Sequence, residues 1–220
     1  MTIPPPEHAP LFLTGPAGRI EAVLDAPETD VTAQPVLAIV CHPLPTEGGT
    51  MHNKVVTMAA RALRELGITT LRFNFRGAGQ SEGVFDDGDG ELDDLRAVAA
   101  WAREHHPGMA LWLVGFSFGA YVSLRLAAEL HAAVVISIAP PVGRSWDFSG
   151  IDIEMPWLVI QGDADEVVDP HAVYAWLTTL PRQPQLVQMP DAGHFFHRKL
   201  IDLRGAVKHG VRDWLPVPAA

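Results

Sequence analysis

The sequence predicts an α/β fold with a mostly parallel, twisted sheet and helices on both of its faces. Short apolar segments alternate along the chain with longer segments of helical periodicity, which is typical of right-handed βαβ units. Val36–Cys41 (VLAIVC) is apolar at every position, as expected for a strand covered on both faces. Apolar residues make up 48% of the 220 residues and charged residues 19%, a balance that allows a large core.

An antiparallel hairpin is expected at the start of this sheet. Residues 11–13 and 19–24 have the pattern of two short strands, and a turn-forming segment with Gly15, Pro16 and Gly18 separates them. The Pro-rich residues 1–10 are expected to be poorly ordered. They lack the basic and apolar regions of a signal peptide, and no apolar run approaches the ~18–20 residues that span a bilayer. We therefore expect a cytoplasmic protein with no membrane partner.

Six strands and five helices are expected to alternate after the hairpin. The predicted strands cover residues 36–41, 69–75, 110–114, 133–138, 157–160 and 185–189. The predicted helices cover residues 53–66, 91–106, 118–130, 170–180 and 195–214. Gly67 is a typical helix stop, and Asp169 before Pro170 is typical of a helix start. The chain shows no internal repeat and no long linker, so residues 1–220 are predicted to form a single domain.

Composition and motifs argue against several classes of function. The formal net charge of −10 would repel the phosphate backbone of a nucleic acid. Cys41 is the only cysteine, which excludes an intramolecular disulfide and a cysteine-cluster metal site. The histidines form no H-E-x-x-H motif and have no third ligand at a useful spacing. We expect no nucleic-acid partner, no metal and no cofactor.

The sharpest local motif is Gly115-Phe116-Ser117-Phe118-Gly119, a G-x-S-x-G between a predicted strand and a predicted helix. A serine in that position lies on a tight, strained turn with its hydroxyl above the carboxyl edge of the sheet. The glycines leave room for neighbouring backbone, and the helix directs N–H groups at the site. The motif alone also fits an ordinary strand-to-helix turn, so the assignment of Ser117 as a nucleophile depends on its partners.

A base and a carboxylate follow Ser117 along the chain. A serine hydroxyl is a weak nucleophile until a base accepts its proton, and His194 lies on a Gly-containing loop after the last predicted strand. The imidazole needs a buried carboxylate to orient it. Asp165 follows the predicted strand 157–160, and Asp163, two residues nearer that strand, is the alternative. We expect the three loops to meet at one edge of the sheet.

Two further segments extend this pattern. They are Cys41-His42-Pro43-Leu44-Pro45 with Gly48-Gly49-Thr50, and Phe73-Asn74-Phe75-Arg76-Gly77-Ala78-Gly79-Gln80-Ser81-Glu82-Gly83. With these motifs and the order Ser, Asp, His, nearly the whole chain resembles the small lidless serine hydrolases of the α/β-hydrolase superfamily. The resemblance implies the α/β-hydrolase fold. The G-x-x-D-x-x-V pattern of that family favours Asp165 over Asp163.

The resemblance also implies an oxyanion hole and an open site. One donor is expected to be the Phe118 N–H, next after the nucleophile. The other is expected in the loop after Val36–Cys41, where many relatives have His-Gly-x and this chain has His42-Pro43-Leu44. Because proline has no N–H, Leu44 is the expected second donor. A cap domain usually follows the strand after the nucleophile helix, but residues 139–155 are too few to form one.

We therefore expect a serine hydrolase that cleaves a small-molecule carboxylic ester, of short or medium acyl chain, through an acyl-enzyme. The candidate pocket residues are Leu44, Phe116, Phe118, Trp146, Phe195 and Phe196. Each of them fits the hydrophobic core equally well. A thioesterase, a peptidase or an amidase would use the same triad, and a non-catalytic ligand-binding protein on this scaffold is a further alternative.

Overall fold

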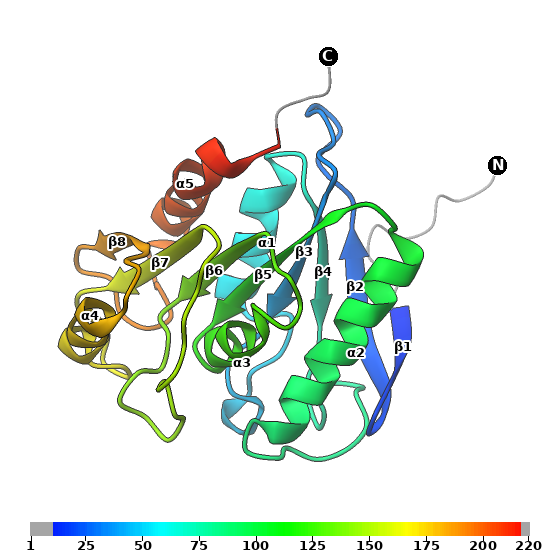
Figure 1. Cartoon of the computed structure of the whole chain (residues 1–220), viewed down its shortest axis with the longest axis horizontal. Coiled ribbons are helices and arrows are strands. Elements are labelled where there is room, and N and C mark those ends of the chain that lie inside the picture. The colour runs from blue at the N-terminus through cyan, green and yellow to red at the C-terminus, as the bar shows by residue number, and fades with distance from the viewer. Residues whose placement is uncertain (1–10, 217–220) are drawn as a thin grey trace.

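One eight-stranded sheet organises residues 11–216, the part of the chain that the computed structural model describes (Figure 1). The strands are β1 (Leu11–Gly15), β2 (Gly18–Asp25), β3 (Val36–Cys41), β4 (Thr69–Phe73), β5 (Ala110–Phe116), β6 (Val134–Ile138), β7 (Trp157–Gly162) and β8 (Gln185–Met189). Their order in the sheet is β1-β2-β4-β3-β5-β6-β7-β8. β1 pairs antiparallel with β2 and β2 with β4, whereas all other neighbours are parallel. The predicted fold class and hairpin are confirmed, and residues 1–10 lie outside the described part.

Helices cover both faces of this sheet. The helices are α1 (Lys54–Arg64), α2 (Asp89–His105), α3 (Phe118–Leu126), α4 (Pro170–Thr179) and α5 (Leu200–Val211), with short 3-10 turns η1 (Pro45–Glu47) and η2 (Arg212–Trp214). α2, α3 and α4 pack on one face, and α1 and α5 pack on the other (Figure 1). The side chain of Asp169 caps α4 by accepting the His171 N–H, as its position before Pro170 predicts. Among the described residues, no helix is both long and apolar enough to cross a membrane.

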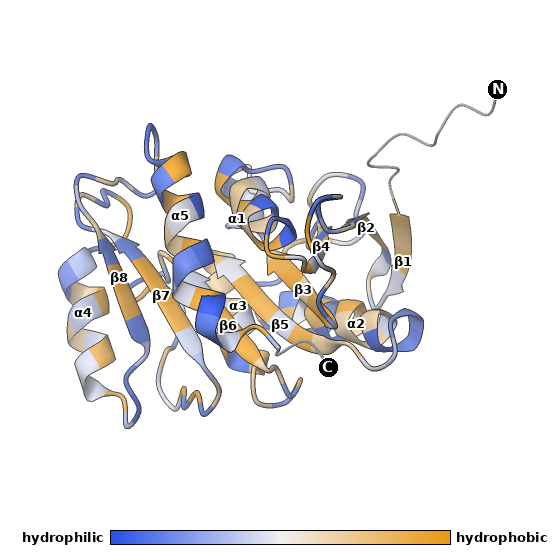
Figure 2. Ribbon diagram, turned by 90° about the horizontal axis from the view of Figure 1, so that it is seen from above, coloured by the Kyte–Doolittle hydropathy of each residue, from blue (hydrophilic) through white to orange (hydrophobic). Residues whose placement is uncertain are grey.

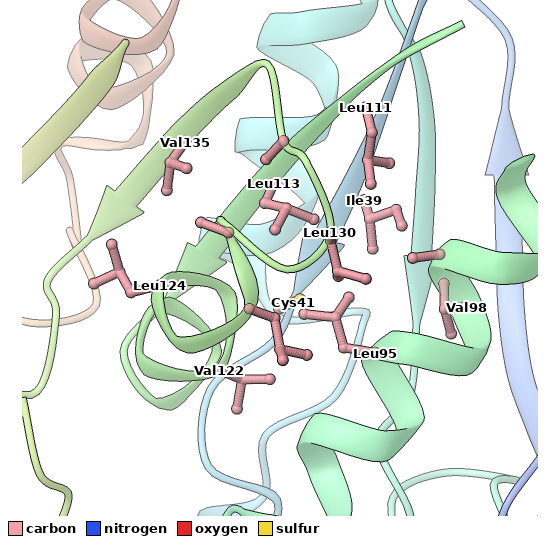
Figure 3. Close-up of a cluster of buried hydrophobic side chains, with 14 of the residues drawn as sticks. Ile39, Cys41, Leu95, Val98, Leu111, Leu113, Val122, Leu124, Leu130 and Val135 are labelled. Carbon is pink, nitrogen blue, oxygen red and sulfur yellow. The ribbon is translucent and has the colours of Figure 1, made fainter. Parts of the chain in front are cut away.

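The sheet separates two hydrophobic clusters. The central strands are largely apolar when the molecule is seen from above (Figure 2), and β3 is buried at every position. Ile39 and Cys41 of β3 belong to the cluster beneath α2 and α3 (Figure 3). Ala38 and Val40 belong to the cluster beneath α1 and α5. Burial on both faces fixes β3, and with it the start of the loop that follows at the carboxyl edge of the sheet.

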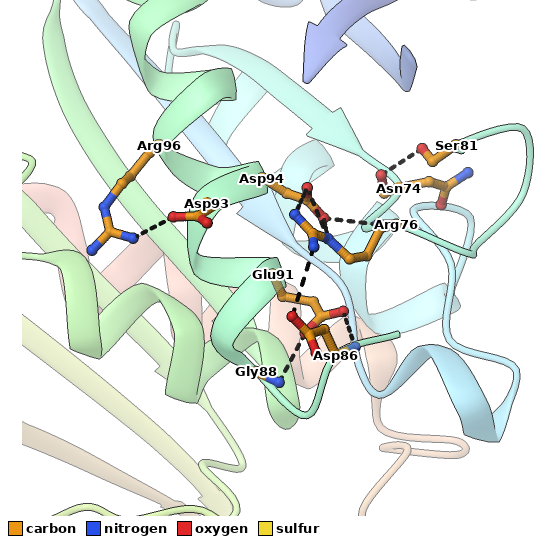
Figure 4. Close-up of polar contacts among 9 residues, drawn as sticks. All are labelled: Asn74, Arg76, Ser81, Asp86, Gly88, Glu91, Asp93, Asp94 and Arg96. Atoms are coloured by element: carbon orange, nitrogen blue, oxygen red, sulfur yellow. Dashed lines mark hydrogen bonds and ion pairs between the residues drawn. The ribbon is translucent and has the colours of Figure 1, made fainter. Parts of the chain in front are cut away.

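A partly buried ion pair holds the loop between β4 and α2. Arg76 donates from its guanidinium to Asp94 Oδ1 at 2.9 Å and from its backbone N–H to Asp94 Oδ2 at 2.9 Å (Figure 4). Glu91 accepts the N–H groups of Asp86 and Gly88, which satisfies backbone donors around the start of α2 (Figure 4). These contacts tie the backbone just after β4 firmly to α2.

Several boundaries differ from the predicted ones. β5 continues past residue 114 to Phe116, directly before Ser117, and α3 ends at Leu126 instead of residue 130. The last helix begins at Leu200 and not near residue 195. Phe196 and Arg198 have φ values of 50° and 62°, which an α-helix does not contain. Residues 139–155, between β6 and β7, contain no helix, so no helical cap is present there, as predicted.

Candidate active site

Ser117 connects β5 to α3 in a strained conformation. Its φ of 52° and ψ of −120° are rare for a residue other than glycine and cost on the order of 1–3 kcal/mol. A Cβ at Gly115 would overlap the Gly119 carbonyl, and a Cβ at Gly119 would overlap the Cys41 carbonyl. The two glycines therefore permit close backbone approach, and Gly119 allows the end of β3 to pack directly on the first turn of α3.

Ser117, His194 and Asp165 form a continuous chain of hydrogen bonds. His194 Nε2 lies 3.1 Å from Ser117 Oγ, and His194 Nδ1 lies 2.9 Å from Asp165 Oδ2. An ionised carboxylate only accepts hydrogen bonds, so Nδ1 carries the proton and Nε2 is available to accept the serine proton. All three residues are buried. The structure thus brings together three predicted residues that follow β5, β7 and β8, in the geometry that activates a serine.

Four groups donate hydrogen bonds to the Asp165 carboxylate. Oδ1 accepts the N–H groups of Val167 and Val168 at 2.9 and 2.8 Å. Oδ2 accepts from Gln161 Nε2 at 3.0 Å and from His194 Nδ1 at 2.9 Å. Burial alone would raise the pKa of Asp165, but the hydrogen bonds from His194, Val168 and Val167 bring this pKa below its usual value. The group is therefore ionised at neutral pH and stabilises a positive charge on the imidazole.

Asp163, the alternative to Asp165, makes a different contact. Its Oδ1 accepts the Asp191 N–H at 2.7 Å and so ties the loop after β7 to the loop after β8. Glu166 Oε2 adds a second tie by accepting the backbone N–H of His194 at 3.1 Å. The imidazole itself is bound by Asp165. Asp163 and Glu166 therefore position the backbone that carries His194.

Three of the predicted pocket side chains lie in the hydrophobic core and do not line the cleft. Phe116 is 1% exposed, and its ring centroid lies 5.1 Å from that of His194, where it supports the imidazole from below the cleft. The Phe118 ring is buried between Phe75 and Trp146. Phe196 is buried in the cluster beneath α1 and α5. An apolar residue near the end of a strand can face either the core or a cleft, and these three face the core.

Two backbone N–H groups near Ser117 have no acceptor among the described residues. Phe118 is the first residue of α3, where N–H groups lack an intrahelical partner. The Leu44 N–H, in the loop after β3, donates no hydrogen bond to a described residue either. Leu44 and Ser117 line the same cleft. Such donors can stabilise negative charge that develops on a substrate oxygen.

A cleft of about 330 Å³ lies over Ser117 and His194. Among the predicted pocket residues, Leu44, Trp146 and Phe195 line it. The described lining residues that the sequence analysis missed are Pro43, Glu47, Gly48, Gly49, Asn53, Pro141, Arg144, Val167 and Val168. Pro43, Gly48 and Gly49 belong to a motif that the sequence shows, but the loops have no periodicity that would indicate which of their residues face a cleft. Within residues 11–216, no three His, Cys, Asp or Glu side chains converge to hold a metal ion.

The chain is similar to several known proteins. The model of a family described as serine aminopeptidase, S33, matches residues 39–151. An α/β serine hydrolase without a lid from Xanthomonas campestris is 67% identical, with a TM-score of 0.94 and full coverage of both chains. An α/β serine hydrolase homologue from Coxiella burnetii is 43% identical over 92% of this chain and 97% of its own, with a TM-score of 0.89.

A more distant structure shares the fold. Est1E from Butyrivibrio proteoclasticus, with ferulic acid bound, is 22% identical over 92% of this chain and 98% of its own, with a TM-score of 0.79. At this identity the likeness concerns the fold alone. The family match covers the end of β3, Ser117 and most of the segment after β6, and the two bacterial relatives extend the similarity to nearly the whole chain. The protein therefore belongs to the α/β-hydrolase superfamily, among the serine hydrolases without a lid.

Proposed function

We propose that this protein hydrolyses carboxylic esters of short or medium acyl chain, with Ser117 as nucleophile, His194 as general base and acid, and Asp165 as the group that orients His194. The observation that carries the proposal is the chain of hydrogen bonds from Ser117 Oγ through His194 to Asp165 at the floor of an open cleft. Membership of a serine hydrolase family supports it.

The reaction would proceed in two half-reactions at the same serine. Ser117 Oγ attacks the ester carbonyl carbon while His194 Nε2 takes the hydroxyl proton. The carbonyl oxygen becomes negatively charged and accepts hydrogen bonds from the Leu44 and Phe118 N–H groups, each typically worth about 10²–10³ in kcat. His194 then gives the proton to the leaving alcohol. Water, activated by the same imidazole, attacks the acyl-enzyme and releases the acid.

The cleft favours a small acyl group. Its volume of about 330 Å³ suits a short chain or one aromatic ring, and Leu44, Trp146 and Phe195 supply apolar contact. No helical cap formed by residues 139–155 encloses a long chain. The bound ferulic acid of Est1E is itself a carboxylic acid, the type of product that ester hydrolysis releases.

Amide cleavage is the second candidate, because the matching family is described as a serine aminopeptidase. An aminopeptidase must recognise a free ammonium group, for which a carboxylate is the natural partner. Among the described residues that line the cleft, Glu47 is the only acid, and it is exposed on η1. An oxygen ester, a thioester and an aminoacyl anilide would separate the three activities. We expect the highest kcat/KM for the oxygen ester.

Removal of the nucleophile tests the proposal. Ser117→Ala should lower kcat for p-nitrophenyl butyrate by roughly 10⁴–10⁶, the usual loss when the nucleophile of a triad is removed. Ser145→Ala, the same change at an exposed position on the segment after β6, should keep the wild-type rate. A hydrolysis rate that survives Ser117→Ala would remove the nucleophile assignment, whereas a wild-type protein with no hydrolysis would favour a non-catalytic binding protein.

A further inference from the structure

A buried histidine outside the proposed triad lies at the end of β3. His42 is fully buried, and both of its ring nitrogens are engaged. Nε2 accepts the Phe75 N–H at 3.0 Å, and Nδ1 lies 2.6 Å from the Pro43 carbonyl oxygen. The backbone N–H of Phe75 can only donate a hydrogen bond, so Nε2 of His42 must be unprotonated. The ring proton therefore lies on Nδ1, which donates it to the Pro43 carbonyl oxygen. Burial lowers the pKa of His42 to about 4, although the bond to Pro43 opposes the shift, so the ring is neutral at pH 7.

The bond to Pro43 fixes the orientation of a whole peptide group. The Pro43 carbonyl and the Leu44 N–H belong to one planar trans peptide, so they point in opposite directions. When the imidazole of His42 holds the carbonyl toward the buried side, the Leu44 N–H is turned away from that side. This N–H has no acceptor among the described residues, and Leu44 lines the cleft with Ser117. The orientation of this proposed donor therefore depends on His42.

The neighbouring groups restrict the same peptide further. The Leu44 carbonyl accepts the N–H groups of Glu47 at 3.2 Å and Gly49 at 3.0 Å. A Cβ at Gly49 would overlap the Pro43 carbonyl, so that position requires glycine. Pro43 itself has no N–H. Leu44, which lines the cleft, consequently keeps an N–H that is available for a substrate oxygen.

The other side of His42 is anchored to α2. Phe75, whose N–H binds Nε2, is followed by Arg76, and the Arg76 N–H and guanidinium bind Asp94 (Figure 4). Asp94 is itself buried in α2. The imidazole thus links the loop after β3 to the firmly held backbone after β4. A ring fixed at Nε2 can hold the Pro43 carbonyl without movement of its own.

We propose that His42 is a positioning residue of the oxyanion hole, which aims the Leu44 N–H at the substrate oxygen by holding the carbonyl of the same peptide. The proposal rests on the proposed function, because a misplaced donor matters only if a charged oxygen forms beside Ser117. His42 does not touch the substrate. It acts through Pro43, and its loss should therefore weaken the transition state more than substrate binding.

Two substitutions separate this role from a merely structural one. The side-chain amide nitrogen of Asn stands two bonds from Cβ, as Nδ1 of histidine does, so His42→Asn can still donate to Pro43 but cannot reach Phe75. The amide oxygen of Gln stands three bonds from Cβ, as Nε2 does, so His42→Gln can still accept from Phe75 but cannot hold Pro43. Each variant loses one buried hydrogen bond. We expect similar decreases in the midpoint of thermal unfolding.

The kinetic expectation distinguishes the two variants. With p-nitrophenyl butyrate, kcat should fall roughly 10–100-fold in His42→Gln and less than about fivefold in His42→Asn, with KM within about threefold in both, as for a lost oxyanion donor. The proposal is overturned if His42→Asn loses as much kcat as His42→Gln, or if both keep the wild-type kcat. A wild-type protein that neither hydrolyses esters nor reacts with a fluorophosphonate would instead contradict the proposed function.

A structure of the wild-type protein after reaction with a fluorophosphonate tests the same point without any variant. The phosphoryl oxygen of the Ser117 adduct should lie within hydrogen-bond distance of the Leu44 and Phe118 nitrogens, while Nδ1 of His42 still binds the Pro43 carbonyl. An adduct with the Pro43 carbonyl turned into the cleft, or with the His42 bond broken and the Leu44 contact intact, would overturn the proposal.

Discussion

Two loops that line the same cleft are held in very different ways. In the loop after β3, His42 binds the Pro43 carbonyl, and the Leu44 carbonyl accepts two N–H groups. In the segment after β6, Arg144 and Trp146 reach other loops through single side-chain bonds, each 3.3 Å long, to the Val167 and Asp87 carbonyls. The first loop orients one peptide group through a buried side chain. The second also has backbone bonds, from the Val142 and Arg144 N–H groups to the Pro140 and Pro141 carbonyls, but it presents side chains to the cleft.

The difference indicates that the two loops have different functions in the proposed site, one in stabilising charge and the other in selecting the acyl group. Stabilisation of a developing charge requires a donor fixed to within a fraction of an ångström, and the loop after β3 meets that demand with backbone bonds and a buried imidazole. Selection among acyl groups depends on the size and polarity of the walls. Arg144 is exposed and Trp146 is half-buried, so the segment after β6 can change without disturbing the donor.

The largest expected contrast comes from adding one methyl group to each loop. In Gly49→Ala the new Cβ would overlap the Pro43 and Leu44 carbonyls and displace the Leu44 N–H. We expect kcat for p-nitrophenyl butyrate to fall roughly 10²-fold, as when an oxyanion donor is removed. Steady-state kinetics on the purified variant measure this loss.

Gly143→Ala is the matched change on the other loop. Gly143 has a φ of 77° and Ala172 Cβ as its nearest neighbour, at 3.6 Å from the added Cβ. The variant should lose roughly 1–2 kcal/mol of stability from backbone strain and keep its kcat within about twofold, because this segment carries no donor. Equal losses of kcat in Gly49→Ala and Gly143→Ala would contradict the claim that only the loop after β3 carries an oxyanion donor.

The strand ends were predictable from the sequence, and the walls of the cleft were not. Ser117, Asp165 and His194 each follow a predicted strand, and a parallel sheet brings its carboxyl ends to one edge. The burial of Phe116 and Phe196 depends instead on how helices pack around them. Apolarity alone does not distinguish a core residue from a wall residue.

The role of His42 was equally invisible in the sequence. The motif that contains it was recognised, but its ring is fixed by the N–H of Phe75, which lies 33 residues further along the chain. The polar wall residues Glu47 and Arg144 lie on exposed loops. No periodicity marks such positions, because their neighbours are determined by tertiary structure.

A smaller effect is expected from the exposed wall. The Trp146 ring packs on Phe118 with ring centroids 5.1 Å apart and closes one side of the cleft. Trp146→Ala should raise the ratio of kcat/KM for p-nitrophenyl octanoate to that for p-nitrophenyl butyrate by about tenfold, because loss of the indole ring leaves space for a longer acyl chain. Trp101→Ala, which removes an equal ring from α2, should leave the ratio unchanged. A shift of similar size in both variants would contradict a wall role for Trp146.

Acid should destabilise the folded protein through His42. The pKa of His42 is about 4 in the folded protein, against 6.5 for an ordinary histidine. The unfolded chain therefore binds more protons between these values, and the stability that this group contributes is lost as the pH falls through that window. Between pH 7 and pH 5, the wild type should lose about 2 kcal/mol more of its unfolding free energy than His42→Asn does. Urea unfolding at the two pH values measures this difference, and parallel losses would refute it.

The central claim is that Ser117 is made nucleophilic by His194 and Asp165. Intact-mass analysis after incubation with a fluorophosphonate tests it most directly. The wild type should gain one phosphonyl group, mapped to Ser117 by peptide sequencing, while Ser117→Ala stays unmodified and His194→Ala reacts far more slowly. A wild-type protein that remains unmodified, or that carries the group on another residue, would contradict the account.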